Sequence, residues 1–271
     1  MWRKIKRQLR RCKSRVDYKD GGINRAINRF IEERRDAPAP KEEIFAPEVL
    51  IPCFNQGRFL KTALDSVNAQ CPPIGCKVTV INDASTDDTL EHIRRLQAEY
   101  SFTLIDNAVN LNQSGSLNKA IEQSANNLFI VLNADDALTR YAIATIIWVL
   151  ENDGVVRMVG GGCIPFADER TLLLNARLPQ QLGYAPIYRS YGPEQARRYR
   201  ELNDLNMTMS GCAFLKSAWQ AAGGFREFKE RICSFDDRDF QMRVSVLFEV
   251  AVLEEPLAFW RTHSSTHRAQ I

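Results

Sequence analysis

The chain has 271 residues, 45% of them hydrophobic and 25% charged, which is typical of a globular protein with one large domain or two small ones. No uninterrupted apolar run approaches the ~20 residues of a membrane-spanning helix, and the basic N-terminus lacks the apolar core of a secretory signal. We therefore expect a cytoplasmic protein. The seven cysteines are scattered and form no Cys-x-x-Cys motif, a pattern that favours reduced thiols over disulfides or a zinc site.

The first 16 residues differ in charge from the rest of the chain. They contain eight Lys or Arg and no acid, whereas the remaining residues have 28 basic and 33 acidic side chains. The apolar residues of this segment recur at helical spacing: Trp2, Ile5, Leu9, Cys12 and Val16. Such an amphipathic helix suits an anionic membrane surface, where the protein would be peripheral, or a partner protein. A basic arm can also bind nucleic acid, but we expect no nucleic-acid partner here.

A stiff, Pro-rich linker follows at Ala37-Pro38-Ala39-Pro40. We expect residues 1–46 to form a helical extension that includes this linker, and residues 47–271 to form the main domain. From Glu48 onward, apolar patterns typical of strands and helices alternate. The strands are expected at 49–54, 77–81, 102–105 and 128–132, and the helices at 58–70, 86–100 and 114–125. This alternation predicts an α/β fold with a mostly parallel sheet and helices on both faces.

The second part of the main domain is less regular. Residues 164–206 are rich in Arg and Tyr and show no clear period. On either side of them, helices are expected at 139–150, 216–222 and 235–247, and strands at 155–159, 207–215, 250–253 and 257–260. Gly223 and Gly224 are placed to end the helix at 216–222.

Two adjacent acids, Asp135 and Asp136, follow the fully apolar run at 128–132. Neighbouring carboxylates repel each other and are costly to desolvate, so a cation is expected beside them. In an open α/β sheet this edge is also where ligands bind, which favours a divalent cation that holds a phosphorylated substrate. The alternative is that Asp136 caps a helix beginning near Thr139 and that Asp135 is a solvated turn residue. The acid pair alone favours neither interpretation.

The ends of the first two strands have further polar and aromatic groups. Pro52 has no N–H to donate, so strand pairing must stop near it. The ring of Phe54 could stack on a nucleotide base, although this residue taken alone favours a place in the core. Asp83 could accept a hydrogen bond from a base N–H or a ribose hydroxyl. The alternative is that Asp83 and Ser85 only cap the next helix, which Ser85 or Thr86 is expected to begin.

Several segments resemble, in order, the motifs of family 2 of the glycosyltransferases, which have the GT-A fold. They are Ile51-Pro52-Cys53-Phe54-Asn55, Val80 to Thr89, Asn110 to Asn118, Asn133-Ala134-Asp135-Asp136, Gly223-Gly224-Phe225, Asp236 to Arg243, and Phe259 to His263. The resemblance covers roughly residues 48–265. It implies a nucleotide-binding half at 47–138 and an acceptor-binding half at 139–271.

The resemblance also implies roles for individual residues. The nucleotide would be bound by Pro52, Phe54, Asn55, Asp83, Asn118, Asn133, Ala134 and Asp135. Mn²⁺ or Mg²⁺ would bridge the two phosphates of the donor and would be bound by Asp135, Asp136 and His263. Asp237 would be the catalytic base, ionised at neutral pH because it lies near a helix N-terminus. One of Asp236 and Asp237 is expected to cap that helix, and Asp239 to pair with Arg243.

Three residues depart from the family pattern, since Asn82 and Asn133 stand where acids are usual and Leu117 where Arg is common. We expect an inverting, metal-dependent glycosyltransferase, of hexosyl or N-acetylhexosaminyl type. It would use a nucleotide-diphospho sugar, with UDP the favoured nucleotide, and a surface glycan or lipid-linked acceptor. The alternative is a catalytically weak nucleotide-sugar-binding partner or regulator, which the two asparagines favour. A nucleotidyltransferase is disfavoured because the first strand is followed by a loop with a single glycine, Gly57.

Overall fold

The computed structural model describes residues 46–71, 73–175, 185–193, 205, 207–226 and 236–262. All of them belong to one compact unit of the chain, Pro38–Ile271. The predicted N-terminal helix, His263 and about half of residues 164–206 (176–184, 194–204 and 206) therefore lie outside the described residues. Within the ranges described, no helix is both long and apolar enough to cross a membrane.

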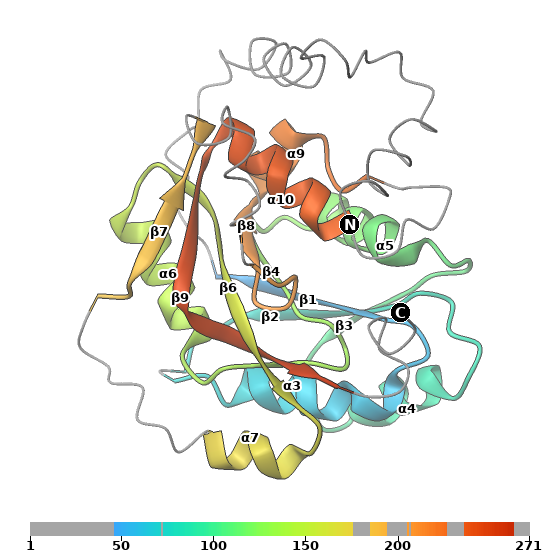
Figure 1. Cartoon of the computed structure of the whole chain (residues 1–271). Helices are drawn as coiled ribbons and strands as arrows, with labels where there is room; N and C mark the ends of the chain where they lie inside the picture. Colours follow the sequence, from blue (N-terminus) through green and yellow to red (C-terminus); the bar gives the residue numbers. More distant parts are fainter. Residues whose placement is uncertain are drawn as a thin grey trace, which may run out of the picture. The chain divides into compact units, whose positions relative to one another are not determined.

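Four parallel strands form one half of the sheet, in the order β3-β2-β1-β4 (Figure 1). They are β1 (Glu48–Cys53), β2 (Lys77–Asn82), β3 (Thr103–Asp106) and β4 (Leu128–Val131). Every residue of β1 and β4 is buried, as is usual where helices cover both faces of a parallel sheet. The crossovers contain the helices η2 (Gly57–Phe59), α3 (Leu60–Asn68), α4 (Thr89–Leu96) and α5 (Asn112–Gln123).

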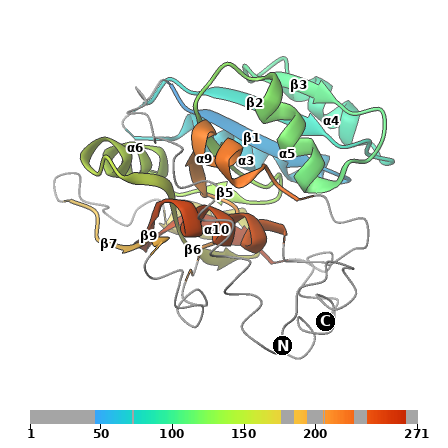
Figure 2. The same cartoon turned by 90° about the horizontal axis from the view of Figure 1, so that it is seen from above.

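Antiparallel and parallel pairs mix in the other half, where the sheet continues as β4-β8-β6-β9-β5 and β7 pairs with β9. The strands are β5 (Ala137–Leu138), β6 (Val156–Phe166), β7 (Tyr188–Tyr191), β8 (Ala213–Leu215) and β9 (Glu249–Arg261). The helices are α6 (Ala142–Asn152), α7 (Glu169–Asn175), α9 (Lys216–Ala222) and α10 (Asp236–Leu247). Figures 1 and 2 show α3 and α4 on one face of the sheet and α5, α9 and α10 on the other.

Most of the predicted elements are confirmed, including the mostly parallel α/β sheet and the helix that ends at Gly223, which has φ +78. The strand predicted at 207–215 is wrong over residues 207–212, because Gly211 has φ +84 and turns the chain before β8 begins. The two strands predicted at 250–253 and 257–260 form one strand, β9, which pairs in parallel with β6 on both sides of a register shift. Strands β5 and β7 and helix α7 were not predicted, since each is too short to show a period.

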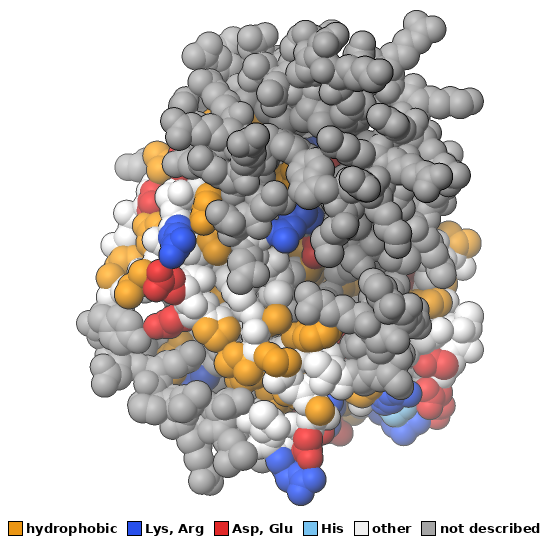
Figure 3. All heavy atoms as spheres, viewed as in Figure 1, with side chains coloured by type: hydrophobic (Ala, Val, Ile, Leu, Met, Phe, Trp, Pro, Cys, Tyr) orange, Lys and Arg blue, Asp and Glu red, His pale blue; other side chains and the backbone are white. Residues whose placement is uncertain are grey.

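The surface of the described residues mixes the two signs of charge. On the face seen in Figure 3, acidic and basic side chains are scattered among polar and apolar ones. The five described cysteines, Cys53, Cys71, Cys76, Cys163 and Cys212, are free thiols.

Candidate functional site at the carboxyl edge of the sheet

The loop after β1 presents an aromatic ring at the edge where the parallel strands end. Pairing of β1 with β4 stops at Leu50, whereas pairing with β2 continues to Cys53, which confirms the effect predicted for Pro52. Beyond Cys53 the chain turns sharply, with Asn55 at φ +55, and Phe54 is 41% exposed. The interpretation of Phe54 as a core residue is therefore wrong, and its side chain is accessible at this edge.

Asp83 is buried at the end of β2, and its Oδ1 collects three donors. These are the Leu111 backbone N–H at 2.8 Å, the Ser116 hydroxyl at 2.8 Å and the Asn107 amide at 3.0 Å. All three lie around the N-terminal end of α5, so the interpretation of Asp83 as a cap of the next helix is wrong. Among the described residues nothing donates to Oδ2, which leaves this oxygen able to accept from a ligand.

Asn55 binds the loop after β2 to the loop after β1. Its backbone N–H donates to Ser85 Oγ at 3.0 Å, and its Oδ1 accepts from the Thr86 N–H at 2.8 Å. The prediction that Ser85 or Thr86 caps the helix is therefore wrong. Helix α4 begins at Thr89, whose N–H donates to Asp87 Oδ1 at 3.0 Å.

Asp136 is almost fully buried, with its carboxylate bound to distant segments. It accepts from Ser210 Oγ at 2.5 Å, from the Arg261 N–H at 3.0 Å and from Asn133 Nδ2 at 3.4 Å. The alternative in which Asp136 caps the next helix is thus wrong. Burial and the charge of Asp135 raise the pKa of Asp136 to about 7.

Helix α6 receives its cap from Gln70, at the end of the α3 segment. Gln70 Oε1 accepts from the Ile143 N–H at 3.0 Å, while its Nε2 donates to the Thr139 carbonyl at 2.8 Å. A side chain about 70 positions earlier thus provides the cap that the sequence pattern assigned to a neighbour.

Asp135 and Asn133 face two amides that the sequence did not reveal. Asp135 Oδ2 accepts from Gln56 Nε2 at 3.0 Å, and Asn133 Oδ1 accepts from Gln113 Nε2 at 2.8 Å. Between them Ala134 is fully buried. No sequence signal could have identified Gln56 and Gln113, because polar loop residues of this type are common.

The described acids fit a divalent cation only in combination with a phosphorylated ligand. No group of three or more His, Cys, Asp or Glu that could hold a metal occurs among them. Mg²⁺ in nucleotide sites commonly uses one or two carboxylates and completes its shell with phosphate oxygens and water, and Asp135 meets that requirement. The Arg261 Nη2, whose neighbouring Nε contacts Asp135, is buried with no hydrogen-bond partner among the described residues, which suits a nearby anionic oxygen.

Asp237 lies in the first turn of α10, and its Oδ1 accepts from the Arg238 N–H at 2.7 Å. Burial raises the pKa of Asp237, against the smaller lowering by Arg238. Its charge also raises the pKa of the buried Cys212 thiol, which places Asp237 near the Ser210 turn that binds Asp136. Deeper in α10, Asp239 pairs with Arg243 at 2.8 Å, as predicted.

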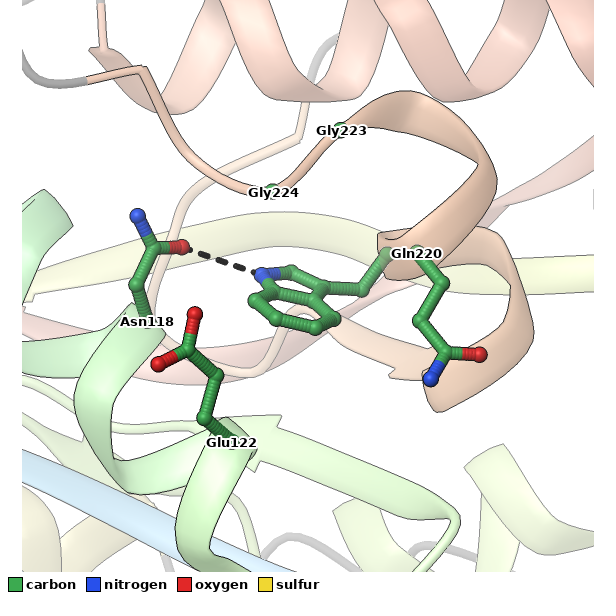
Figure 4. A pocket seen from close by; sticks show the side chains of 6 residues that line it. Asn118, Glu122, Gln220, Gly223 and Gly224 are labelled. Carbon is green, nitrogen blue, oxygen red and sulfur yellow. Dashed lines mark hydrogen bonds between the residues drawn. The ribbon is translucent and has the colours of Figure 1, made fainter.

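Asn118 has a different environment from the other predicted nucleotide-binding residues (Figure 4). Its Oδ1 accepts from Trp219 Nε1 at 3.1 Å and from the Phe225 N–H at 2.9 Å, and its Nδ2 donates to the Phe225 carbonyl at 2.8 Å. These bonds tie α5 to the end of α9, beside a hollow of about 290 Å³ that Glu122 and Gln220 also line. The neighbouring Leu117, where many family members have Arg, is fully buried in the core.

The fold, with its polar and aromatic residues at the carboxyl edge of the parallel strands, is that of the GT-A glycosyltransferases. The family model described as Glycosyl transferase family 2 matches residues 48–219, and the chain belongs to that family. The predicted family and fold are thus confirmed.

The relatives are similar to this chain over only part of their length. The chain is 29% identical to a poly-beta-1,6-N-acetyl-D-glucosamine synthase of Staphylococcus epidermidis over 89 residues. Those residues are 33% of this chain and 21% of that protein. The structure resembles that of S. aureus TarS 1–349 in complex with UDP-GlcNAc, with a TM-score of 0.63, 15% identity, and coverage of 84% of this chain and 61% of that chain. It also resembles the mannosyltransferase PcManGT of Pyrobaculum calidifontis in complex with GDP-Man and Mn²⁺, with a TM-score of 0.59, 16% identity, and coverage of 90% and 66%. The chain spans about a fifth of the length of the curated relatives it matches and under two thirds of TarS 1–349.

Proposed function

We propose that the protein is an inverting glycosyltransferase that moves a sugar from a nucleotide-diphospho sugar to a glycan or lipid-linked acceptor. The observation that supports this most is the convergence at one sheet edge of an exposed aromatic ring, a buried carboxylate with one open oxygen, and an acid turn. These are Phe54, Asp83 and Asp135. The three groups match three features of such a donor: the face of its base, the N–H at the edge of that base, and the diphosphate.

UDP-linked sugar is the donor that we propose. Phe54 would stack on the base, and Asp83 Oδ2 would accept the N–H of a uracil ring. Pro52, Asn55, Asn133 and Ala134 would shape the surrounding surface. TarS and PcManGT are described with UDP-GlcNAc and GDP-Man, and the Staphylococcus relative is named for an N-acetylglucosamine polymer, which together favour a hexosyl or N-acetylhexosaminyl transfer.

Asp237 is the proposed base for the acceptor hydroxyl. Its raised pKa makes the carboxylate a stronger proton acceptor than a solvated aspartate, as a general base requires. In-line attack from the face opposite the diphosphate inverts the anomeric carbon. Mn²⁺ or Mg²⁺ would be held by Asp135, with Asp136 and His263 as further candidate ligands, and supplies charge stabilisation of the departing diphosphate when bound.

We propose that the acceptor is reached at a membrane surface. The support is the basic, amphipathic pattern of residues 1–16, which suits anionic lipid, although a partner protein remains the alternative. In this proposal the catalytic domain would be peripheral at the cytoplasmic face.

Thermal unfolding with a panel of nucleotide sugars, with and without Mn²⁺, tests the donor proposal, because a ligand that binds only the folded state raises the midpoint. We expect UDP-sugars with Mn²⁺ to give the largest rise, and Asp135→Asn to abolish the Mn²⁺-dependent part. Asp237→Asn should retain the rise but lose at least 100-fold in transfer rate. A rise with GDP-sugars alone would refute the donor assignment.

The second candidate function is a nucleotide-sugar-binding protein with little catalysis. It is favoured by Asn133, which brings no charge to the acid turn and is bonded to Gln113. Binding of UDP-sugar with neither transfer nor donor hydrolysis, over a range of glycan and lipid-linked acceptors, would support it against the first proposal.

A further inference from the structure

We propose that Arg261 is the positioning residue of the acid turn: from the end of β9, it fixes the Asp135 carbonyl and the Asp136 carboxylate, and so holds the turn in the arrangement that a cation and diphosphate require. This inference rests on the proposed function. Arg261 is 4% exposed, and three separate groups of it contact the turn or its surroundings.

Two contacts reach the turn directly. The Arg261 backbone N–H donates to Asp136 Oδ1 at 3.0 Å, and the side-chain Nε donates to the Asp135 carbonyl at 2.9 Å. The first bond orients the Asp136 side chain, and the second orients the peptide group between Asp135 and Asp136. Both adjacent acids are thus held by one residue that lies 125 positions further along the chain.

The guanidinium plane is itself fixed from three directions. Its Cζ lies 4.7 Å from the ring centroid of Phe59 and 4.5 Å from that of Phe166, and Nη1 pairs with Glu169 Oε1 at 2.8 Å. The two rings and the ion pair restrict the orientation of the guanidinium, and cation–π attraction compensates part of the cost of burying it. A lysine cannot reproduce the planar contacts or the Nε bond.

These contacts join elements from both halves of the chain. Phe59 belongs to η2 in the first half, next to the loop in which Gln56 contacts Asp135 Oδ2. Phe166 and Glu169 lie at the end of β6 and in α7. Arg261 therefore has the position of an outer-shell residue, and loss of such a partner typically weakens metal affinity 10- to 100-fold.

The test is Mn²⁺ affinity in the presence of saturating UDP, measured on the full chain by calorimetry and by electron paramagnetic resonance. Arg261→Lys should weaken Mn²⁺ binding about tenfold, a larger factor than its effect on UDP binding in EDTA. The matched control is Arg157→Lys, because Arg157 is also buried but donates to the Gly154 and Val156 carbonyls. This control should lower the unfolding midpoint and leave Mn²⁺ affinity within twofold.

Phe59→Leu is the second variant, used if Arg261→Lys does not fold. This substitution removes one of the two rings that contact the Arg261 guanidinium and keeps an apolar side chain there. We expect a smaller loss of Mn²⁺ affinity, about threefold. If the variants fold and bind Mn²⁺ as tightly as the unmodified protein, the role of Arg261 is overturned and the proposed function is not affected. Failure of the unmodified protein to bind Mn²⁺ with UDP would instead overturn the proposed metal-dependent function, and the inference with it.

Discussion

The acids at the carboxyl edge of the sheet differ in their surroundings, and these surroundings separate their roles. Asp83 has one oxygen bound by three protein donors and another that no described residue contacts. Asp136 has both oxygens bound and is buried, whereas Asp135 Oδ2 accepts from the Gln56 amide. Residues of one chemical type thus have surroundings that suit three different roles: the proposed ligand acceptor, a buried anchor and the proposed cation ligand.

Asp83→Asn is predicted to weaken UDP binding about tenfold with little change in folding. The asparagine Oδ1 can still accept from Leu111, Ser116 and Asn107, but an NH₂ group replaces the oxygen that would face a base N–H. Calorimetry with UDP in EDTA measures this without any contribution from metal. Equal affinities for the variant and the unmodified protein would exclude Asp83 from base recognition.

Asp136 is predicted to make the protein less stable as pH rises, in the absence of divalent cations. Its pKa is about 7 when folded and about 3.8 when unfolded, so between these pH values the folded state holds a proton that the unfolded state has lost. The free energy of unfolding therefore falls from pH 4 to pH 7 and levels off above it. Asp136→Asn should remove this dependence, so urea unfolding at pH 5 and pH 8 should show a larger gain from the substitution at pH 8. A gain that is equal at both pH values would contradict the raised pKa.

At the scale of elements, helices and strands depend on side chains from distant parts of the chain. Helix α6 has no cap from its own N-cap residue, Tyr141, and receives one from Gln70. Helix α5 contributes donors to Asp83 through its first turns, and its Asn118 ties it to the end of α9. The site is therefore built at junctions between elements rather than within one.

Gln70→Ala is predicted to lower the free energy of unfolding by about 2 kcal/mol, because it leaves the buried Ile143 N–H without its acceptor and removes one of the two donors to the Thr139 carbonyl. Urea unfolding measures the loss. The control is Gln97→Ala, since Gln97 is exposed at the end of α4 and its side chain makes no described hydrogen bond. A similar small effect of both substitutions would show that α6 does not depend on this cap.

At the scale of the whole described unit, opposite edges of the sheet have different chemistry. At the amino edge, the buried Glu48 accepts from Thr79 Oγ1 at 2.6 Å and from the Ser124 hydroxyl, and pairs with Lys77 at 3.1 Å. These bonds join β1, β2 and the segment before β4. The carboxyl edge holds the groups that we assign to the donor, as ligand sites in open α/β sheets usually do.

Glu48→Ala is accordingly predicted to destabilise the fold by about 3 kcal/mol, since it leaves two buried hydroxyls and an ammonium without their acceptor. The affinity of the remaining folded protein for UDP should change less than twofold. Chemical unfolding and calorimetry at low temperature separate the two quantities. A large loss of affinity in fully folded protein would mean that the two edges are coupled.

The sequence by itself determined the class of fold, the four parallel strands and most of the candidate residues, because hydrophobic periodicity and the order of the motifs are local properties of the chain. The tertiary structure decided what each acid contacts. Ser210, Arg261 and Gln56 reach the acid turn from 74, 126 and 79 positions away, and no local pattern encodes those approaches. For the same reason, three helix caps expected from neighbouring residues, at Asp83, Ser85 and Asp136, proved to be contacts between distant loops.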